Sequence, residues 1–185
     1  MSTQQKATVE EVREMTAKPP KRDQGHGDKF KPIRIPANAQ ATRDGDTIKL
    51  VLPVPVSANS YWRSRVVQAA GRKPMAVTYL SAQAKAYKAL VKKIGEHCEP
   101  FRGPVRLTAR VFRARRAGDL GNAEKVTSDA LAGVAFIDDA QIVEHHWYQD
   151  LDRDNPRVEI EVVALEQVEG LLFDAAPGAR RKGHK

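Results

Sequence analysis

The residues whose types and spacing could do chemistry lie in two short segments, 118–125 and 136–141. Both segments place polar side chains among small apolar ones, and the polar residues of interest are Asp119, Asn122, Lys125, Asp138 and Asp139. Carboxylates are preferred ligands of Mg²⁺ and Mn²⁺, and an ammonium group beside them could stabilise negative charge on a phosphate. If the two segments converge in the fold, the spacing indicates metal-assisted hydrolysis of a phosphodiester.

The same residues also fit a purely structural role. Asp119 is placed to cap the N-terminus of a helix, and Asp138–Asp139 can belong to an ordinary turn. Lys125 and Asp129 can form an ion pair one turn apart on a helix surface. Structural ion pairs are far commoner than active sites, so the pattern alone leaves both interpretations open.

A helix over about 120–134 is expected to carry the first segment. At 100° per residue, Asn122, Lys125 and Asp129 fall on one face, and Asp119 lies where that face begins. The opposite face is expected to be buried and consists of Leu120, Ala123, Thr127, Ala130, Leu131 and Val134.

The remaining patterns predict the elements that must position this helix. Four segments have the patterns of strands: 47–52, 105–111, 142–148 and 157–162. Ser81 is placed to cap a helix whose apolar positions recur at three- and four-residue steps, namely Ala84, Tyr87, Val91, Ile94 and Cys98. Pro53 and Pro55 end the first strand, and a loop is expected between them and Ser81. The order strand, helix, strand, helix, strand, strand predicts an α/β (α+β) domain, a small mixed β-sheet flanked by helices.

Length and composition bound the organisation of the chain. The 185 residues suit one domain. We expect it to span 46–165, between a flexible N-terminal extension (1–45) and a flexible basic C-terminal tail (166–185). Cys98 is the sole cysteine, which excludes an internal disulfide and a zinc site of several cysteines. Because no apolar run could cross a bilayer and no secretory signal is visible, we expect a cytoplasmic protein with no membrane partner.

The charge of the chain indicates a polyanionic partner. The net charge is +8 and the sequence pI about 9.7, which favours nucleic acid. The candidate DNA contacts are Asn59, Arg63, Arg65, Arg72, Lys73, Arg113, Arg115, Arg116 and Asn122. Each basic residue could equally be a solubilising surface charge. Tyr61 and Trp62 could insert near unstacked bases, or could pack in the core or in a dimer interface.

Several dispersed motifs resemble those of the RusA-type Holliday junction resolvases, small endonucleases of bacteria and their phages. Residues 52–63 resemble the amino-terminal signature of this family, and residues 81–87 resemble the helix that follows it. Segments 119–125, 129–131 and 136–143 resemble the family's catalytic region in the same order. The likeness covers approximately 48–163.

The resemblance implies a homodimeric, Mg²⁺-dependent endonuclease that nicks two strands of a four-way DNA junction symmetrically in recombination and repair. It assigns catalytic roles to Asp119, Lys125 and Asp139, of which Asp119 and Asp139 would also bind the metal. Asn122 matches the amide beside the catalytic acids. No small-molecule cofactor is implied.

One position departs from the family pattern. The family has Asp-Leu-Asp-Asn where this chain has Gly121 as the third residue, and glycine has no side chain to bind a metal. Glu124 or Asp138 could take the place of the missing acid. The alternatives are a weakened or inactivated variant of an active enzyme, a rewired site, and a noncatalytic junction-binding protein that retains the fold. A basic component of a ribonucleoprotein is a further possibility.

Overall fold

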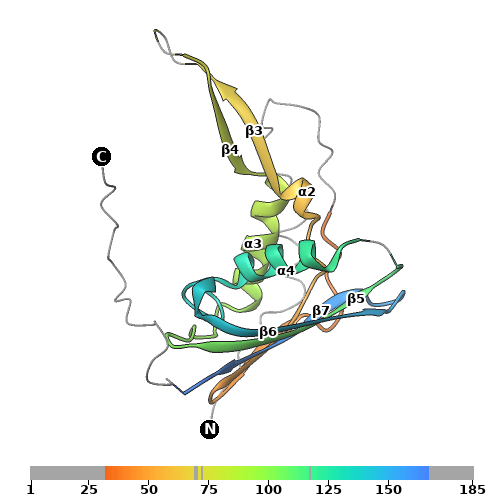
Figure 1. Cartoon of the computed structure of the whole chain (residues 1–185). Helices are drawn as coiled ribbons and strands as arrows, with labels where there is room; N and C mark the ends of the chain where they lie inside the picture. Colours follow the sequence, from red (N-terminus) through yellow and green to blue (C-terminus); the bar gives the residue numbers. More distant parts are fainter. Residues whose placement is uncertain (1–31, 69–70, 72, 117, 167–185) are drawn as a thin grey trace.

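The computed structural model describes residues 32–68, 71, 73–116 and 118–166 (Figure 1). Residues 1–31 of the expected extension and 167–185 of the expected tail lie outside this part of the chain. No helix among the described residues is long and apolar enough to cross a membrane.

A five-stranded sheet forms the base of the domain, in the order β1-β2-β7-β5-β6. The strands are β1 (Gln40–Asp44), β2 (Thr47–Leu52), β5 (Val105–Arg113), β6 (Ile142–Leu151) and β7 (Arg157–Ala164). Neighbouring strands are antiparallel except β5 and β6, which run parallel. Alternation along β2 and β7 turns their apolar side chains to one face, which is the pattern of a half-buried strand.

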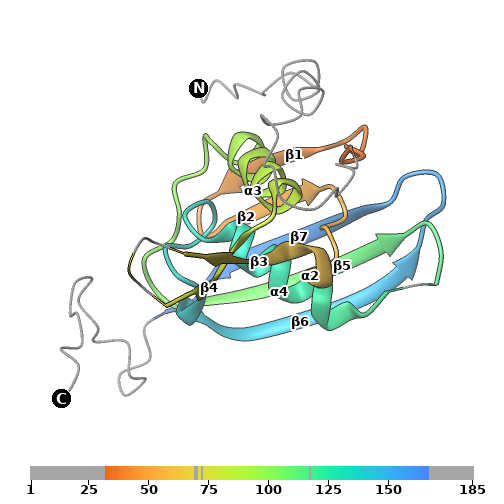
Figure 2. The same ribbon diagram turned by 90° about the horizontal axis from the view of Figure 1, so that it is seen from above.

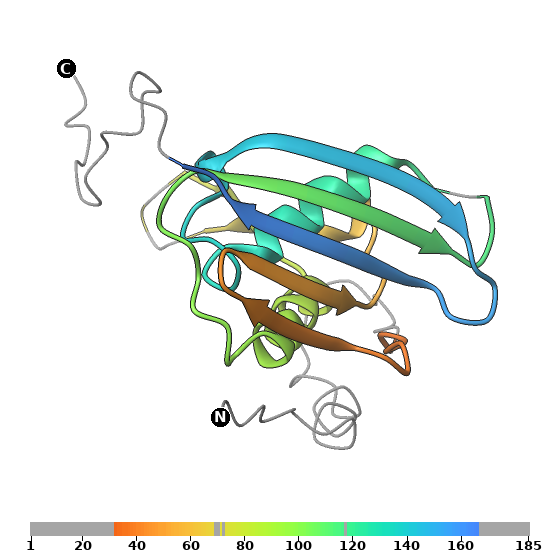
Figure 3. The same ribbon diagram turned by 90° about the horizontal axis from the view of Figure 1, so that it is seen from below.

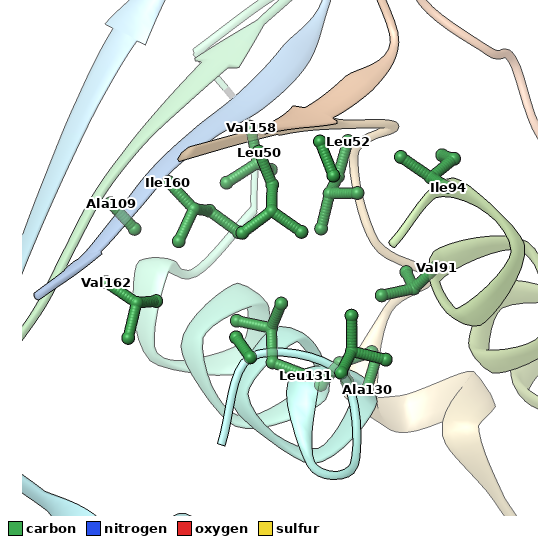
Figure 4. Close-up of a cluster of buried hydrophobic side chains, with 14 of the residues drawn as sticks. Leu50, Leu52, Val91, Ile94, Ala109, Ala130, Leu131, Val158, Ile160 and Val162 are labelled. Carbon is green, nitrogen blue, oxygen red and sulfur yellow. The ribbon is translucent and has the colours of Figure 1, made fainter. Parts of the chain in front are cut away.

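Two helices cover that apolar face. These are α3 (Ala82–Ile94) and α4 (Leu120–Leu131), and they lie on one side of the sheet (Figures 1 and 2). Figure 3 looks onto the opposite face of the sheet, where no helix of the described chain lies. The core fills the space between the layers, and Figure 4 shows Leu50, Leu52 and Ile160 facing Val91 and Leu131. The predicted α/β class and core order of elements are therefore confirmed.

The predicted details of the helices are largely confirmed. The Ser81 hydroxyl caps α3 by accepting a hydrogen bond from the amide of Ala84, at 3.1 Å. The predicted apolar positions are all buried, but Cys98 lies beyond the last residue of α3, Ile94. The predicted buried face of α4 is also found, with Leu120 only partly buried. This helix ends at Leu131, so the expected helical end near Val134 was too late.

The predicted loop between Pro53 and Ser81 is wrong over most of its length. It contains the short helix α2 (Ala58–Tyr61) and a separate antiparallel hairpin of β3 (Trp62–Val67) and β4 (Met75–Leu80). The hairpin projects away from the sheet and helices (Figure 1). Most of its side chains are exposed on both faces, so its sequence lacks the alternation that identifies a half-buried strand.

The expected N-terminal extension also contains a strand. β1 pairs with β2 from Gln40↔Val51 to Asp44↔Thr47, through a two-residue turn of Gly45 and Asp46. Gly45 has φ +54°, a conformation that favours glycine. The Gly45-Asp46 dipeptide, with glycine at the first turn position, is a recognised hairpin signal that could have identified this strand.

Candidate active site

Asp119 begins α4 and is held there by its own side chain. Its carboxylate accepts a hydrogen bond from the amide of Gly121 at 3.0 Å, which satisfies one of the free amides of the first turn. The Arg113 guanidinium, at the end of β5, donates to the Asp119 carbonyl at 3.1 Å. The residue remains exposed. The predicted capping role of Asp119 is thus confirmed, and the cap leaves the carboxylate open to solvent.

Gly118 permits this arrangement in two ways. Its φ of +96° disfavours any side chain, and a Cβ there would lie 2.3 Å from Nη1 of Arg113. We expect Gly118→Ala to lower the free energy of unfolding by about 1–2 kcal/mol and to displace Arg113 from Asp119. Chemical denaturation would measure the loss. Gly103→Ala is the control, because a Cβ at Gly103 meets nothing within 4 Å. Equal effects of the two substitutions would contradict this account.

The second acidic segment lies at the 3₁₀ turn η1 (Asp139–Gln141). The Asp138 carboxylate accepts from the amide of Ala140 at 2.9 Å, and the Gln141 side-chain oxygen accepts from the amide of Asp138 at 2.8 Å. The buried Gln141 also donates to the carbonyls of Phe101 and Gly103, so the turn is bound beside the start of β5. Asp138 is therefore a capping residue, and Asp139 is exposed on a well-supported turn.

A single chain does not bring Asp119 and Asp139 together. Asp119 precedes α4 beside the end of β5, whereas Asp139 follows α4 beside the start of β5. The twelve residues of α4 span about 18 Å, and Figure 1 shows the helix running between the two segments. The described residues contain no group of three His, Cys, Asp or Glu side chains able to hold a metal. The carboxylates of one chain therefore do not fit a shared divalent ion.

The two candidate replacements for the missing acid have other partners. Oε1 of Glu124 lies 3.0 Å from Nδ1 of His145 on β6, and Asp138 caps η1. Gly121 itself is exposed, and a Cβ there would lie 3.6 and 3.9 Å from the two carboxylate oxygens of Asp119. Those are ordinary contact distances. An aspartate would fit at position 121, with its carboxylate beside that of Asp119.

The structure brings Tyr61, Lys88 and Asp129 together in a polar cluster that the sequence did not predict. The Asp129 carboxylate accepts hydrogen bonds from the Tyr61 hydroxyl of α2 and from Nζ of Lys88 on α3, the latter at 3.1 Å. Asp129 thus pairs with Lys88, and the alternative pairing with Lys125 is not formed. Partial burial, and then the charge of Asp139, raise the pKa of Asp129. Asp139 is consequently close enough to Asp129 to act on it electrostatically.

Removing the charge of Asp139 should therefore change the titration of Asp129. We expect Asp139→Asn to lower the pKa of Asp129 without restoring the ordinary value, since burial remains the larger cause. Carbon-13 NMR titration of the carboxyl groups would measure this shift. The pKa of Asp129 is higher in the folded chain than in the unfolded chain. Protonated Asp129 therefore contributes its full share to the stability of the fold at a pH below its pKa in the unfolded chain. That contribution is lost as the pH rises through its pKa in the folded chain. An unchanged Asp129 titration would show that the two acids do not interact.

The predicted DNA contacts fall into three groups. Arg113 positions the start of α4, which is a structural role. Arg115 and Arg116 are exposed between β5 and α4, near the half-exposed Asn122. The third group lies on or beside the projecting hairpin and comprises Asn59, Arg63, Arg65 and Lys73, while Arg72 lies outside the described residues. Lys125 is exposed on α4.

Comparison with known proteins gives one informative result. The family described as Endodeoxyribonuclease RusA matches residues 53–163, which include α2, the hairpin, both long helices and both acidic segments. A search of curated proteins gives no significant match. The match extends over more than half of the chain, and it contains Asp119, Lys125 and Asp139 in one continuous segment. The chain therefore belongs to the RusA family of endodeoxyribonucleases.

Proposed function

We propose that this protein is a homodimeric, Mg²⁺-dependent endonuclease that resolves four-way DNA junctions by paired nicks. The observation that carries the proposal is the family match over 53–163. The exposed acids and basic residues of the matched segment support it. The family membership supplies the general activity, an endodeoxyribonuclease, and we propose the junction substrate, the metal and the dimer for this chain.

In a dimer, Asp119 of one copy could lie beside Asp139 of the other, although the two residues are far apart within one chain. A two-fold axis perpendicular to α4 would reverse the direction of this helix in the second copy, so the Asp139 end of one copy could approach the Asp119 end of the other. Two equivalent sites would result, one for each of two symmetric nicks. β6 supports such pairing, because it is a ten-residue edge strand without proline, glycine or lysine. Long open edges of this kind are suited to pairing with another chain.

The residues of the chain have separate proposed tasks at each composite site. Asp119 of one copy and Asp139 of the other would hold Mg²⁺, which when bound supplies positive charge beside a phosphate and acidifies water. The exposed ammonium of Lys125 would stabilise negative charge on the cleaved phosphate. Arg115 and Arg116 would hold the neighbouring backbone through phosphate contacts.

The second candidate function is a noncatalytic junction-binding protein. It is favoured by Gly121, where the family pattern has an acid, and by the engagement of Glu124 with His145 and of Asp138 with the η1 amides. Such a protein would keep the fold and the basic surface, and would bind branched DNA without cutting it.

A cleavage and binding assay separates the two functions. Labelled four-way junction and linear duplex of matched sequence would be incubated with the full chain in Mg²⁺, in Mn²⁺ and without metal. An endonuclease gives symmetric nicks in the junction only with metal, and Asp119→Asn abolishes them. Tight, salt-sensitive binding to the junction with no product identifies the binding protein. Equal binding to duplex RNA and to the junction would contradict both.

A further inference from the structure

The β3–β4 hairpin exposes apolar side chains that the rest of the fold does not cover. It pairs with no other strand of the described chain and projects from the domain (Figure 1). Val66 is 71% exposed, Met75 is 65% exposed and Trp62 is 47% exposed. A two-stranded hairpin is marginally stable alone, and clustered exposed apolar groups mark interaction sites. The hairpin is therefore a candidate binding element.

The two faces of the hairpin differ in chemistry. The register pairs Trp62 with Leu80, Ser64 with Thr78 and Val66 with Ala76, which makes one face free of charge. The hydroxyl oxygens of Ser64 and Thr78 lie 3.3 Å apart on this face. Alternation turns the arginines of β3 to the other face.

The second face is cationic and aromatic near the base of the hairpin and apolar at its outer end, where Val67 pairs with Met75. Arg63 is paired with Tyr79 and Arg65 with Val77, and the Arg65 guanidinium lies 5.5 Å from the centroid of the Tyr79 ring. Cations on one face suit phosphates, whereas the uncharged face suits bases, which present flat apolar surfaces with hydrogen-bonding edges. This division matches a nucleic acid strand better than it matches a protein surface.

The base of the hairpin is hydrogen-bonded to Asp129 of α4. Tyr61 immediately precedes β3, is 3% exposed, and donates its hydroxyl hydrogen bond to Asp129. The amide of Ser81, which follows β4, donates to the carbonyl of Tyr61 at 2.9 Å. Trp62 packs edge-on against Tyr61, with ring centroids 5.4 Å apart. DNA bound by the hairpin is therefore placed relative to α4.

We propose that the hairpin is a branch-reading arm: its apolar end, formed by Val66, Val67 and Met75, enters the base stack at a DNA branch point, while Arg63 and Arg65 contact the flanking phosphates. The inference rests on branched DNA being the substrate, as proposed above. Apolar side chains inserted between base pairs must first unstack them. At a branch point the stack is already interrupted, so insertion costs less there than in linear duplex. The arm would consequently confer preference for branched DNA.

The double variant Val66→Ser/Met75→Ser tests the arm without disturbing the core, because both side chains are exposed. Dissociation constants for a four-way junction and a matched duplex would be measured without divalent metal. A 2-aminopurine base at the branch point would report unstacking by its fluorescence. We expect the wild-type chain to raise this fluorescence, and the variant to lose the rise and to lower the junction preference roughly tenfold.

Two matched variants control the experiment. Val51→Ser removes a partly exposed apolar residue from β2, away from both the hairpin and the β6 edge, and should leave the preference and the fluorescence unchanged. Arg65→Gln should weaken binding to junction and duplex equally and make binding less sensitive to salt. Circular dichroism and thermal melting would show that each variant folds.

Two results would overturn the proposal. One is an unchanged preference and fluorescence response in the Val66→Ser/Met75→Ser variant. The other is a change in its sedimentation behaviour without DNA, which would show that the hairpin packs on a second copy of the chain. Because the binding assay contains no metal, it measures branch recognition independently of cleavage. A chain that recognises the branch but does not cut it once Mg²⁺ or Mn²⁺ is added disproves the endonuclease and leaves the arm intact. If the Val66→Ser/Met75→Ser variant cleaves the junction as well as the wild-type chain and with the same preference over duplex, the arm is disproved and the endonuclease is not.

Discussion

Mixing the Asp119→Asn and Asp139→Asn chains is expected to restore junction nicking that neither variant supports alone. In a mixed dimer with composite sites, one site contains both substitutions and the other contains neither. Random exchange makes about half of the dimers mixed, so about a quarter of all sites should be intact. Their product should be a single nick, because each mixed dimer has one working site. Denaturing electrophoresis of labelled junctions would detect it.

The doubly substituted chain gives the opposite result and serves as the control. Mixed with the wild-type chain, Asp119→Asn/Asp139→Asn places one substitution in each composite site, so mixed dimers should be inactive. If each chain formed its own site, these dimers would keep one active site, and the two single variants would not complement each other. That pair of outcomes would disprove the shared site. Both mixtures should be prepared in whichever background cleaves, wild type or Gly121→Asp.

Restoring an acid at position 121 is expected to give the largest gain in activity. The structure leaves room for the side chain, and its carboxylate would lie beside that of Asp119. Removing a group that only hydrogen-bonds to a metal ligand lowers metal affinity or activity by about 10–100-fold. Adding a direct ligand should therefore raise the cleavage rate by at least about tenfold. Junction cleavage rates against Mg²⁺ concentration would measure the gain, which should include half-saturation at lower metal concentration.

Gly121→Asn is the matched control for that gain. It has the shape of aspartate without the charge, and it also removes the glycine from the first turn of α4. An equal increase in both variants would attribute the effect to the helix. Tight junction binding with no cleavage by Gly121→Asp, in any divalent metal, would identify the protein as a junction binder.

The sheet and the long helices could be predicted because their sequences carry a buried face. Ile48, Leu50 and Leu52 alternate in β2, and the apolar residues of α3 recur with helical spacing, so burial is visible in the pattern. The hairpin was not predicted for the opposite reason. Its residues are exposed on both faces, and nothing in their order distinguishes a projecting strand pair from a loop.

The local role of single residues in the candidate site could be predicted from the sequence, but their arrangement in space could not. The position of Asp119 as a cap and of Asp138 in a turn follows from local chemistry, and both are found. The separation of Asp119 from Asp139 depends on the direction of α4 across the sheet, which spacing does not define. The cluster of Tyr61, Lys88 and Asp129 draws on three separate elements, so no local pattern reveals it.

The parallel pairing of β5 with β6 affects how the candidate site unfolds relative to the rest of the domain. β1, β2, β7 and β5 form a continuous antiparallel sheet, and β6 is attached at its margin after the α4 crossover. Transient detachment of β6 with α4 would therefore dismantle both carboxylate segments at once while the antiparallel remainder stays folded. The amide protons of this crossover unit should exchange with solvent sooner than those of β7. Substitutions that stabilise the unit should therefore keep the candidate site assembled for longer.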